Sequence, residues 1–373
     1  MNTAKTHDEL AYLLVSRGMG SSRGLSPDEL TTQISEQLAS VNYYRMAAYW
    51  YQFRIPRKGK ATPSKAIVKG TAWEDVVEYY RFDRRLRILL FEAISRIEIA
   101  LREKIAESLS SHDRTIVNPQ NDASLFRKDF KEKREAGNNA KRTCYICPLC
   151  ENGSDQGEVQ NNESKRPSLY ADMMFKIQRG YCGNKGDAAK HYRDTKHIAN
   201  VRNLPVWVFL EYATFGNLSM LLSAGMKTAD VASIAATLGF ISRPFFVSVI
   251  SLLHQVRNEC AHQGRIWNRL WTHRDANKVE VPILKTPDQT AWQYLKEAED
   301  DTTWETTGQD SLLRSPSCTA AAIVACHTLM KQVAPNNSWT KRMFAIFDDC
   351  PLNKMAWEVG FCHKDWQSHR IWQ

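Results

Sequence analysis

The chain has 373 residues, of which 43% are hydrophobic and 24% are charged, a balance that excludes a disordered protein. Fifty Lys and Arg against 41 Asp and Glu give a net charge of +9, which permits a polyanionic partner without identifying one. No apolar stretch approaches the roughly 20 residues that span a bilayer, and residues 1–9 lack the basic and apolar regions of a secretory signal. We therefore expect a cytoplasmic protein that has no membrane partner.

Helices are predicted along most of the chain. Residues 26–29 (SPDE) form a capping box that opens a helix toward Leu38. Residues 71–74 (TAWE) form a second capping box. Residues 71–109 then contain neither Pro nor Gly, and apolar residues recur there at helical spacing. Because strand alternation and hairpin signals do not recur between the helices, the sequence predicts an all-α fold.

Four segments divide the chain. Apolar periodicity fades in the second segment, which we expect to be a polar, exposed and partly irregular insertion between two helical halves. The segments are residues 1–111 (first helical half), 112–203 (insertion), 204–285 (second helical half) and 286–373 (helical C-terminal extension). Beyond the insertion, the helical pattern resumes at residue 204, runs past residue 222, and is expected again at residues 228–238, 242–262, 320–333 and 339–347.

Residues 242–264 are predicted to form a helix with two different faces. Ser242 is a suitable N-cap, Pro244 lies in the first turn, and Gly264 is a suitable stop. At about 100° per residue, an apolar stripe separates from a polar face that only Ala261 interrupts. The stripe holds Val249, Leu253, Val256 and Cys260, and the polar face holds His254, Arg257, Asn258 and His262.

This polar face suits transesterification of RNA, in which the ribose 2′-OH attacks the adjacent phosphorus. A histidine, with a pKa of about 6.5, can take the attacking proton or protonate the leaving oxygen. Arg257 can bind two phosphoryl oxygens while charge develops on them. Asn258 can orient an imidazole or hold a phosphate oxygen. No carboxylate cluster accompanies these side chains, so we expect catalysis to need no metal.

The spacing of Arg257 and His262 resembles the motif of HEPN ribonucleases, in which four to six residues separate an arginine from a histidine. Residues 257–269 (RNECAHQGRIWNR) also resemble the motif of abortive-infection (Abi) proteins of the AbiD and AbiF type. Most of the chain outside the insertion matches this family. The further matches are residues 42–45, 49–50, 80–87 and 96–102, with Trp207, Glu211, Phe215, Gly216, Gly360, Phe361 and Trp366.

The resemblance implies a HEPN-like helical bundle and an endoribonuclease that acts as a toxin in phage defence. Some members of the family are regulated by a small noncoding RNA, which implies RNA as substrate and as regulator. HEPN sites usually combine two copies of the motif. Since this chain has one clear copy, the resemblance implies a homodimer that brings two sets of Arg257 and His262 together. A degenerate second site within the chain is the alternative.

A purely structural interpretation of the motif is also open. His262 would then complement the dipole at the helix C-terminus, and Arg257 would pair with Glu259 or another acid. The matches elsewhere in the chain favour catalysis by Arg257, Asn258 and His262.

Five further side chains are candidates for supporting this site. Glu98 and Arg102 form either an ordinary ion pair one helical turn apart or a pair that orients Arg257 or His262. Glu211, among aromatic residues, needs a partner if it is buried, and Arg257 is one candidate. The candidate supporting residues are His254, Arg265, Glu98, Arg102 and Glu211.

Aromatic and basic residues are interleaved between residues 43 and 60. Such a pattern can stack unpaired bases while cations bind phosphates, although aromatic residues on a helix more often pack in the core. We expect most of the aromatic rings to pack and the loop at residues 57–69 to contact RNA. The candidate RNA-binding residues are Tyr44, Arg45, Arg54, Arg57, Lys58 and Lys60.

Cysteines in the insertion suggest a structural zinc site. Of nine cysteines, three fall within residues 144–150 at the Cys-x-x-Cys spacing that suits tetrahedral zinc. A bound zinc would explain how a polar insertion stays folded. The candidate ligands are Cys147, Cys150, Cys182 and His191. The alternative is a set of exposed reduced thiols, and a catalytic zinc is disfavoured.

Two main functions therefore compete. A toxin that cleaves RNA should depend on His262 and Arg257 but not on a divalent metal. A non-enzymatic module that holds a structured noncoding RNA should depend more on Arg57, Lys58 and Lys60. A zinc-dependent nucleic-acid module in the insertion is a third, weaker hypothesis, and chelation would abolish its binding.

Overall fold

In the computed structural model, the described residues are 4–58, 62–132, 134–135, 165–166, 168–275, 279–284, 312–352, 354–362 and 365–372. They are mostly helical, with two short antiparallel strand pairs, so the predicted all-α class is confirmed. Among them, no helix combines the length and the apolar character that crossing a bilayer requires.

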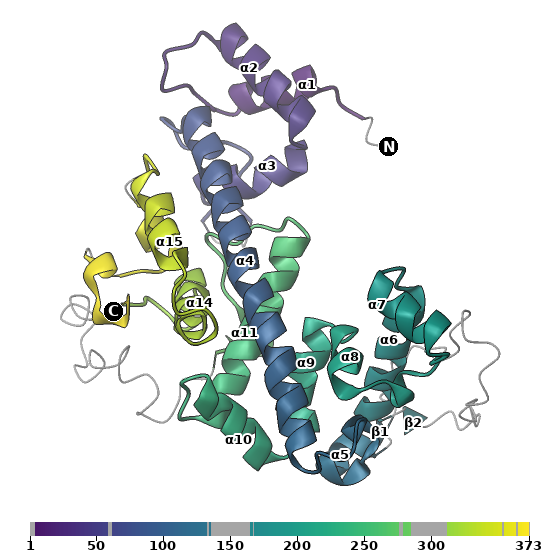
Figure 1. The fold of residues 1–373 in the computed structure, drawn as a ribbon. Coiled ribbons are helices and arrows are strands. Elements are labelled where there is room, and N and C mark those ends of the chain that lie inside the picture. Colours follow the sequence, from purple (N-terminus) through teal and green to yellow (C-terminus); the bar gives the residue numbers. More distant parts are fainter. Residues whose placement is uncertain are drawn as a thin grey trace.

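The helices and strands follow one another as the bar in Figure 1 indicates. The first part holds α1 His7–Ser16, α2 Pro27–Ser40, α3 Tyr43–Trp50, α4 Trp73–Ser111 and α5 Lys128–Lys131. The middle part holds β1 Arg134–Glu135, β2 Lys165–Arg166, α6 Leu169–Gly183, α7 Asp187–Lys190, the π-helical turn η4 His191–Thr195, α8 Val206–Glu211, α9 Phe215–Met220, the π-helical turn η6 Leu221–Gly225, α10 Thr228–Thr237 and α11 Arg243–Ala261. The last part holds β3 Thr272–Arg274, β4 Glu280–Pro282, α14 Thr319–Val333, α15 Trp339–Asp348 and α16 Met355–Val359. Single 3-10 turns lie at Tyr51–Phe53, Pro119–Asn121, Ala123–Leu125, Val201–Asn203, Trp366–Ser368 and Arg370–Trp372.

Helix α4 is the axis of the fold (Figure 1). Its buried side chains include Leu86, Leu90, Ile94 and Leu101, which follow one another at helical spacing. Helices α3, α8, α11, α14 and α15 all pack against it. One long helix therefore contacts both predicted helical halves and the C-terminal extension.

The start of α4 differs from the predicted capping box. Thr71 Oγ1 donates to Val68 O at 2.8 Å, and the N-cap is Ala72, whose side chain cannot cap. Glu74 accepts a hydrogen bond from Ser21 Oγ at 2.8 Å instead of reaching back to the N-cap. The prediction was wrong because a partner 53 residues earlier in the chain binds this carboxylate. The capping box at the start of α2, between Ser26 and Glu29, is confirmed.

The second helical half contains a break that the apolar pattern does not predict. Residues 204–222 form two short helices, α8 and α9, separated by residues 212–214. Helices α10 and α11 lie close to their predicted bounds. The predicted apolar stripe of α11 is buried, since Val249, Leu253 and Val256 are at most 1% exposed and Cys260 is 5% exposed.

The described part of the predicted insertion is more regular than expected. Helix α6 buries Met173, Ile177 and Tyr181, which the surrounding polar sequence obscured. Tyr170 of the same helix makes ring contacts with Phe126 and Phe130. The apolar side chains of this segment thus join the main hydrophobic core.

The C-terminal extension packs on α4 and α11 through α14. His327 of α14 is buried, with Nδ1 2.7 Å from Thr340 Oγ1 and Nε2 2.9 Å from Ile371 O. Burial lowers the pKa of His327 to about 4, so the ring is neutral at pH 7.

Candidate active site

The C-terminal end of α11 presents the predicted catalytic histidine. Helix α11 begins after Ser242, whose Oγ accepts from Phe245 N, and it ends at Ala261. Gln263 adopts the left-handed conformation (φ 59°), and Gly264 N donates to Glu259 O at 2.8 Å. The left-handed residue is thus Gln263, one position before the predicted glycine stop. His262 is the C-cap of the helix, and its side chain is exposed.

Arg257 lies on the side of α11 that faces α4. Its Nε is 3.8 Å from Glu98 Oε2, too long for a hydrogen bond, and this Nε has no hydrogen-bond partner among the described residues. The guanidinium carbon lies 5.9 Å from the centre of the Phe91 ring. Glu98 and the Phe91 ring thus lie against one part of the guanidinium. The Arg257 side chain is 34% exposed, so an anion can reach it.

Glu98 and Arg102 connect Arg257 to the break between α8 and α9. Arg102 Nη2 donates to Glu98 Oε1 at 2.7 Å, and Arg102 also donates to Leu210 O and Ala213 O at 3.0 Å each. The two side chains therefore form an ion pair one helical turn apart, and Glu98 also faces Arg257 of α11. Glu98 lies between two arginines and is the carboxylate beside Arg257.

Glu211 does not play the part considered for it. Its side chain is exposed at the end of α8, and the described residues provide no ion-pair partner for it. Because α8 directs this carboxylate to solvent, the burial that would have required a partner such as Arg257 is absent.

His254 and Asn258 form a pair one turn apart on α11. Asn258 Nδ2 lies 3.1 Å from His254 Nε2, so the amide donates and the imidazole nitrogen accepts. Burial lowers the pKa of His254, the nearby Arg257 lowers it further, and Glu98 opposes them. His254 is therefore neutral at pH 7. Asn258 orients this buried ring and not the exposed His262.

Helix α9 packs closely on His254. The Phe215 ring meets the imidazole edge to face, with centres 6.0 Å apart. A Cβ on Gly216 would lie only 3.0 Å from His254 Nε2. A glycine at this position lets the backbone of α9 approach the imidazole.

A second set of buried polar groups fixes the backbone that follows His262. Asp83 Oδ1 accepts from Ile266 N at 3.0 Å and from Trp267 N at 2.7 Å. Asp83 Oδ2 accepts from Tyr49 Oη at 2.6 Å and from Arg87, which also donates to Gly264 O at 3.2 Å. The sequence contained a signal for this buried cluster. Asp83 and Arg87 are a charged pair four residues apart, and they interrupt the apolar stripe of α4.

Two surface arginines add to this anchor. Arg265 Nη1 donates to Ala48 O at 3.1 Å, and Arg45 Nη1 donates to Gln263 O. Arg265 therefore binds α3 and does not face Arg257. These contacts bring the predicted tyrosine-rich block and the predicted catalytic motif together at one end of α11.

Of the other predicted RNA-binding residues, Tyr44 lies on α3, and Arg54, Arg57 and Lys58 follow that helix. Tyr44, Arg57 and Lys58 are exposed, and the guanidinium of Arg54 lies 5.1 Å from the centre of the Tyr51 ring. Tyr49 and Trp50 are buried, as expected for rings that mostly pack. Lys60 lies outside the described residues.

The predicted zinc ligands are only partly described. Cys147 and Cys150 lie outside the described residues. Cys182 lies on α6, where its Sγ is 3.1 Å from Gln178 Nε2, and His191 is exposed at the start of η4. The described ranges contain no group of three metal-binding side chains.

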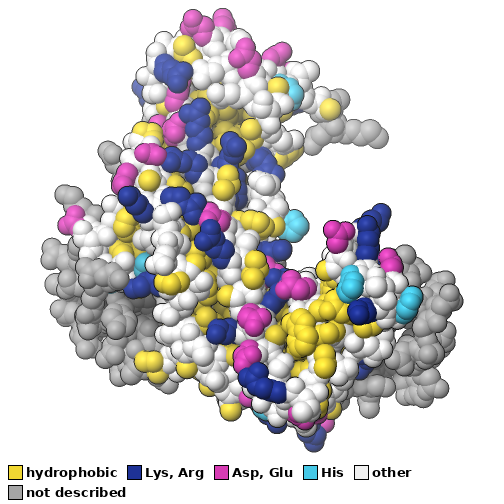
Figure 2. Space-filling view, viewed as in Figure 1, with side chains coloured by type: hydrophobic (Ala, Val, Ile, Leu, Met, Phe, Trp, Pro, Cys, Tyr) yellow, Lys and Arg dark blue, Asp and Glu magenta, His cyan; other side chains and the backbone are white. Residues whose placement is uncertain are grey.

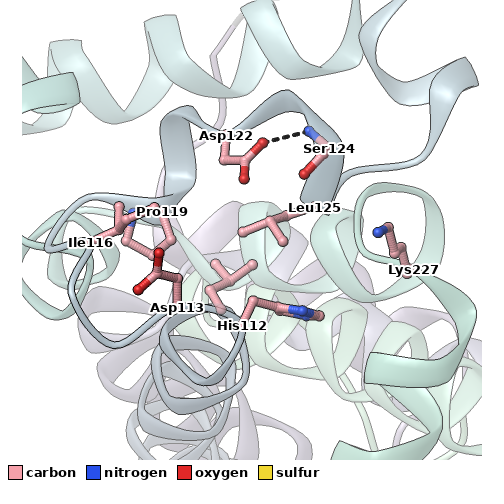
Figure 3. Close-up of a pocket in the computed structure, with 9 residues that line it drawn as sticks. His112, Asp113, Ile116, Pro119, Asp122, Ser124, Leu125 and Lys227 are labelled. Carbon is pink, nitrogen blue, oxygen red and sulfur yellow. Dashed lines mark hydrogen bonds between the residues drawn. The ribbon is translucent and has the colours of Figure 1, made fainter.

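A pocket of about 290 Å³ lies at the C-terminal end of α4 (Figure 3). In this view Asp113 and Pro119 lie on one side and Lys227 on the other, with His112 and Asp122 between them. None of its lining residues belongs to the candidate site.

Comparison with known proteins gives one match. The family model described as Abi-like protein matches residues 36–268, which include α4, α8, α9 and α11. No curated protein and no solved structure matches the chain.

Proposed function

Because the chain belongs to the Abi-like protein family, we propose that it is an abortive-infection protein whose activity is metal-independent RNA cleavage. In this proposal it is a HEPN endoribonuclease of the AbiD and AbiF type that acts as a toxin in phage defence. Family membership supports the abortive-infection role. The Arg257 and His262 geometry supports the chemistry.

The proposed reaction uses the two side chains at the end of α11. The ribose 2′-OH attacks the adjacent phosphorus, the bond to the 5′-oxygen breaks, and a 2′,3′-cyclic phosphate forms. His262 exchanges a proton with the attacking or leaving oxygen, since its exposed imidazole can both accept and donate a proton. Arg257 binds the phosphoryl oxygens as charge develops on them.

The observation that carries the proposal is the state of the Arg257 guanidinium. Glu98 orients it without forming a hydrogen bond to its Nε, and Arg102 anchors Glu98 to backbone carbonyls. An arginine serving only as a structural ion pair would be expected to have its donors bound to the carboxylate. The Nε of Arg257 is buried, but its two terminal nitrogens make no hydrogen bond to any described residue, so they are left for a ligand.

We also propose a homodimer formed through the exposed side of α4. Ile88 and Ile99 lie three helical turns apart and are 61% and 63% exposed. Phe91, under Arg257, is also partly exposed, so these three apolar side chains, with Glu92 and Ser95 between them, form an exposed strip beside the candidate site. A second copy covering this strip would bring its own Arg257 and His262 close. Light scattering tests it, since Ile99→Glu should shift the mass to that of a monomer.

A small noncoding RNA is the proposed regulator, and a structural zinc is proposed for Cys147, Cys150, Cys182 and His191. These proposals rest on the family resemblance and on cysteine spacing. Co-purification of a discrete RNA species with the native protein is the expected sign of the regulator.

Cleavage of RNA in EDTA tests the proposed function directly. The native protein should cleave and leave 2′,3′-cyclic phosphate ends, whereas His262→Ala and Arg257→Ala should each lose at least about a hundredfold in rate. His273→Ala and Arg274→Ala are the matched controls, because both side chains are exposed outside the site. Equal rates for His262→Ala and His273→Ala would refute the assignment. RNA binding without any cleavage would instead favour the non-enzymatic module.

A further inference from the structure

Two segments of the chain each carry an excess of positive charge. Residues 42–58, at α3 and the loop after it, contain four Lys and Arg and no Asp or Glu. Residues 176–197, at α6, α7 and η4, contain six Lys and Arg against two Asp, an excess of four. These two segments carry an excess of eight, compared with the net charge of +9 for the whole chain.

The cations of the second segment are available to a ligand. Arg179, Lys185, Lys190 and Lys196 are exposed, and none of them forms an ion pair within the described part of the chain. The exposed imidazoles of His191 and His197 lie in the same segment. Four exposed cations without ion-pair partners in one surface segment can attract an anionic ligand.

The segment has a defined conformation despite its polarity. Arg193 Nη2 donates to Asn184 O at 2.6 Å, and its other terminal nitrogen donates to Tyr181 O, which closes the loop between α6 and α7. Tyr181 is buried, and its ring meets the Tyr212 ring with centres 4.9 Å apart. Tyr212 precedes Ala213, whose carbonyl binds Arg102. The basic segment is therefore packed on the same turn that Arg102 and Glu98 connect to Arg257.

Helices α3 and α7, one from each basic segment, lie on opposite sides of a hollow in the surface (Figures 1 and 2). Figure 2 shows the hollow between the lobe of α1–α3 and the lobe that carries α7, with Lys, Arg and His side chains over α7. Helix α11 ends beside α3, because Arg45 binds Gln263 O. Gln263 directly follows His262 in the chain, so His262 lies at the end of α11 that is next to α3.

We propose that RNA is held across this hollow by both basic segments, with residues 176–197 forming a second RNA-binding surface opposite α3. The phosphate backbone is the anion that a row of unpaired lysines and an arginine binds best at many points at once. The strand between the two surfaces is then presented to Arg257 and His262. The proposal rests on the proposed function for its choice of RNA as the partner.

Salt-dependent RNA binding by a catalytically silent protein tests the second surface. In the His262→Ala background, the affinity for a fluorescein-labelled stem–loop RNA is measured by anisotropy over a range of KCl concentrations. The lobe variant is Lys185→Gln/Lys190→Gln/Lys196→Gln, and the matched control, with the same change in net charge on the C-terminal extension, is Lys331→Gln/Lys341→Gln/Lys354→Gln.

The lobe variant should bind RNA about ten to a hundred times more weakly near physiological salt. The slope of log binding constant against log KCl concentration should become less steep by about two, as the loss of three phosphate contacts predicts. The control should bind like the parent protein. Equal binding by lobe variant and control, or no RNA binding by the parent, would overturn the proposal. Cleavage by the native protein is measured separately, so failure of the second surface and failure of the proposed ribonuclease give different results.

Discussion

Replacing Asp83 by Asn tests how much the buried cluster of Asp83, Arg87 and Tyr49 stabilises the protein and the backbone that follows His262. Asp83 is fully buried and accepts hydrogen bonds from Ile266 N, Trp267 N, Tyr49 Oη and Arg87. Asn keeps one oxygen for the two backbone donors. Its amide group, however, would place N–H donors against the Tyr49 hydroxyl and the Arg87 guanidinium.

The expected cost follows from the burial of the pair. The side chains of Arg87 and Asp83 are 4% and 0% exposed, and removing one charge from such a pair costs about 3–5 kcal/mol. Typical domains are stable by about 5–15 kcal/mol, so the variant should still fold but unfold at a much lower urea concentration. Asp349→Asn is the matched control. Its partner Arg85 also lies on α4, but this pair is 45% and 60% exposed and should contribute less than about 1 kcal/mol.

Urea unfolding and RNA cleavage together check the reasoning. Arg87→Met alone should also be destabilising, and the double variant Asp83→Asn/Arg87→Met should cost less than the sum of the single changes, because no buried charge is left unpaired. At a temperature where Asp83→Asn remains folded, cleavage should still fall, since Ile266 and Trp267 follow His262 closely. A loss of stability for Asp83→Asn no larger than for Asp349→Asn would refute the argument.

Three further predictions concern other parts of the chain. Gly216→Ala should destabilise the protein by about 1–3 kcal/mol in urea unfolding, because the added Cβ would lie 3.0 Å from His254 Nε2. The imidazole NMR signals of His254 should change as well. A stability equal to or higher than that of the native protein, as expected for Ala in an open helix, would contradict the prediction. The pKa of His327 is lowered to about 4 in the folded protein, so the unfolded chain binds a proton at higher pH than the folded chain does. The free energy of unfolding should therefore fall by about 3 kcal/mol as the pH drops from 6.5 to 4. His327→Gln should lose this part of the pH dependence, and an unchanged pH profile would contradict the assignment. The proposed structural zinc predicts about one zinc per native chain by atomic emission and a loss of it in Cys147→Ser, so native protein without zinc would refute it.

The sequence correctly predicted helix starts that depend on residues close together in the chain. The helix starts at Ser26 and Ser242 were predictable because the capping side chain lies within three residues of its partner. The break between α8 and α9 was not, because Arg102, more than a hundred residues earlier in the chain, binds the carbonyls of Leu210 and Ala213. Leu210 O also accepts from Ala213 N at 3.0 Å, and the packing of α8 on α4 brings the Arg102 donors to both carbonyls at the helix end.

The same distinction applies to the site. The spacing of Arg257 and His262 was visible in the sequence, and the structure places both at the end of α11. Which carboxylate accompanies Arg257 was not predictable, since Glu98 and Glu211 are both plausible by composition. Helix packing decides in favour of Glu98, and α8 turns Glu211 to solvent.

The two histidines of α11 have different environments, and this difference bears on the proposed homodimer. The Nε2 of His254 is occupied by the Asn258 amide, and burial keeps the ring neutral, so proton exchange there would break a hydrogen bond inside the site. His262 is exposed and is the one histidine of the candidate site with an open path to substrate. Transesterification needs a proton to leave the attacking oxygen and another to reach the leaving oxygen, a task that two groups share most easily. A single chain offers one such histidine at this site, which favours an active unit in which the second comes from another copy.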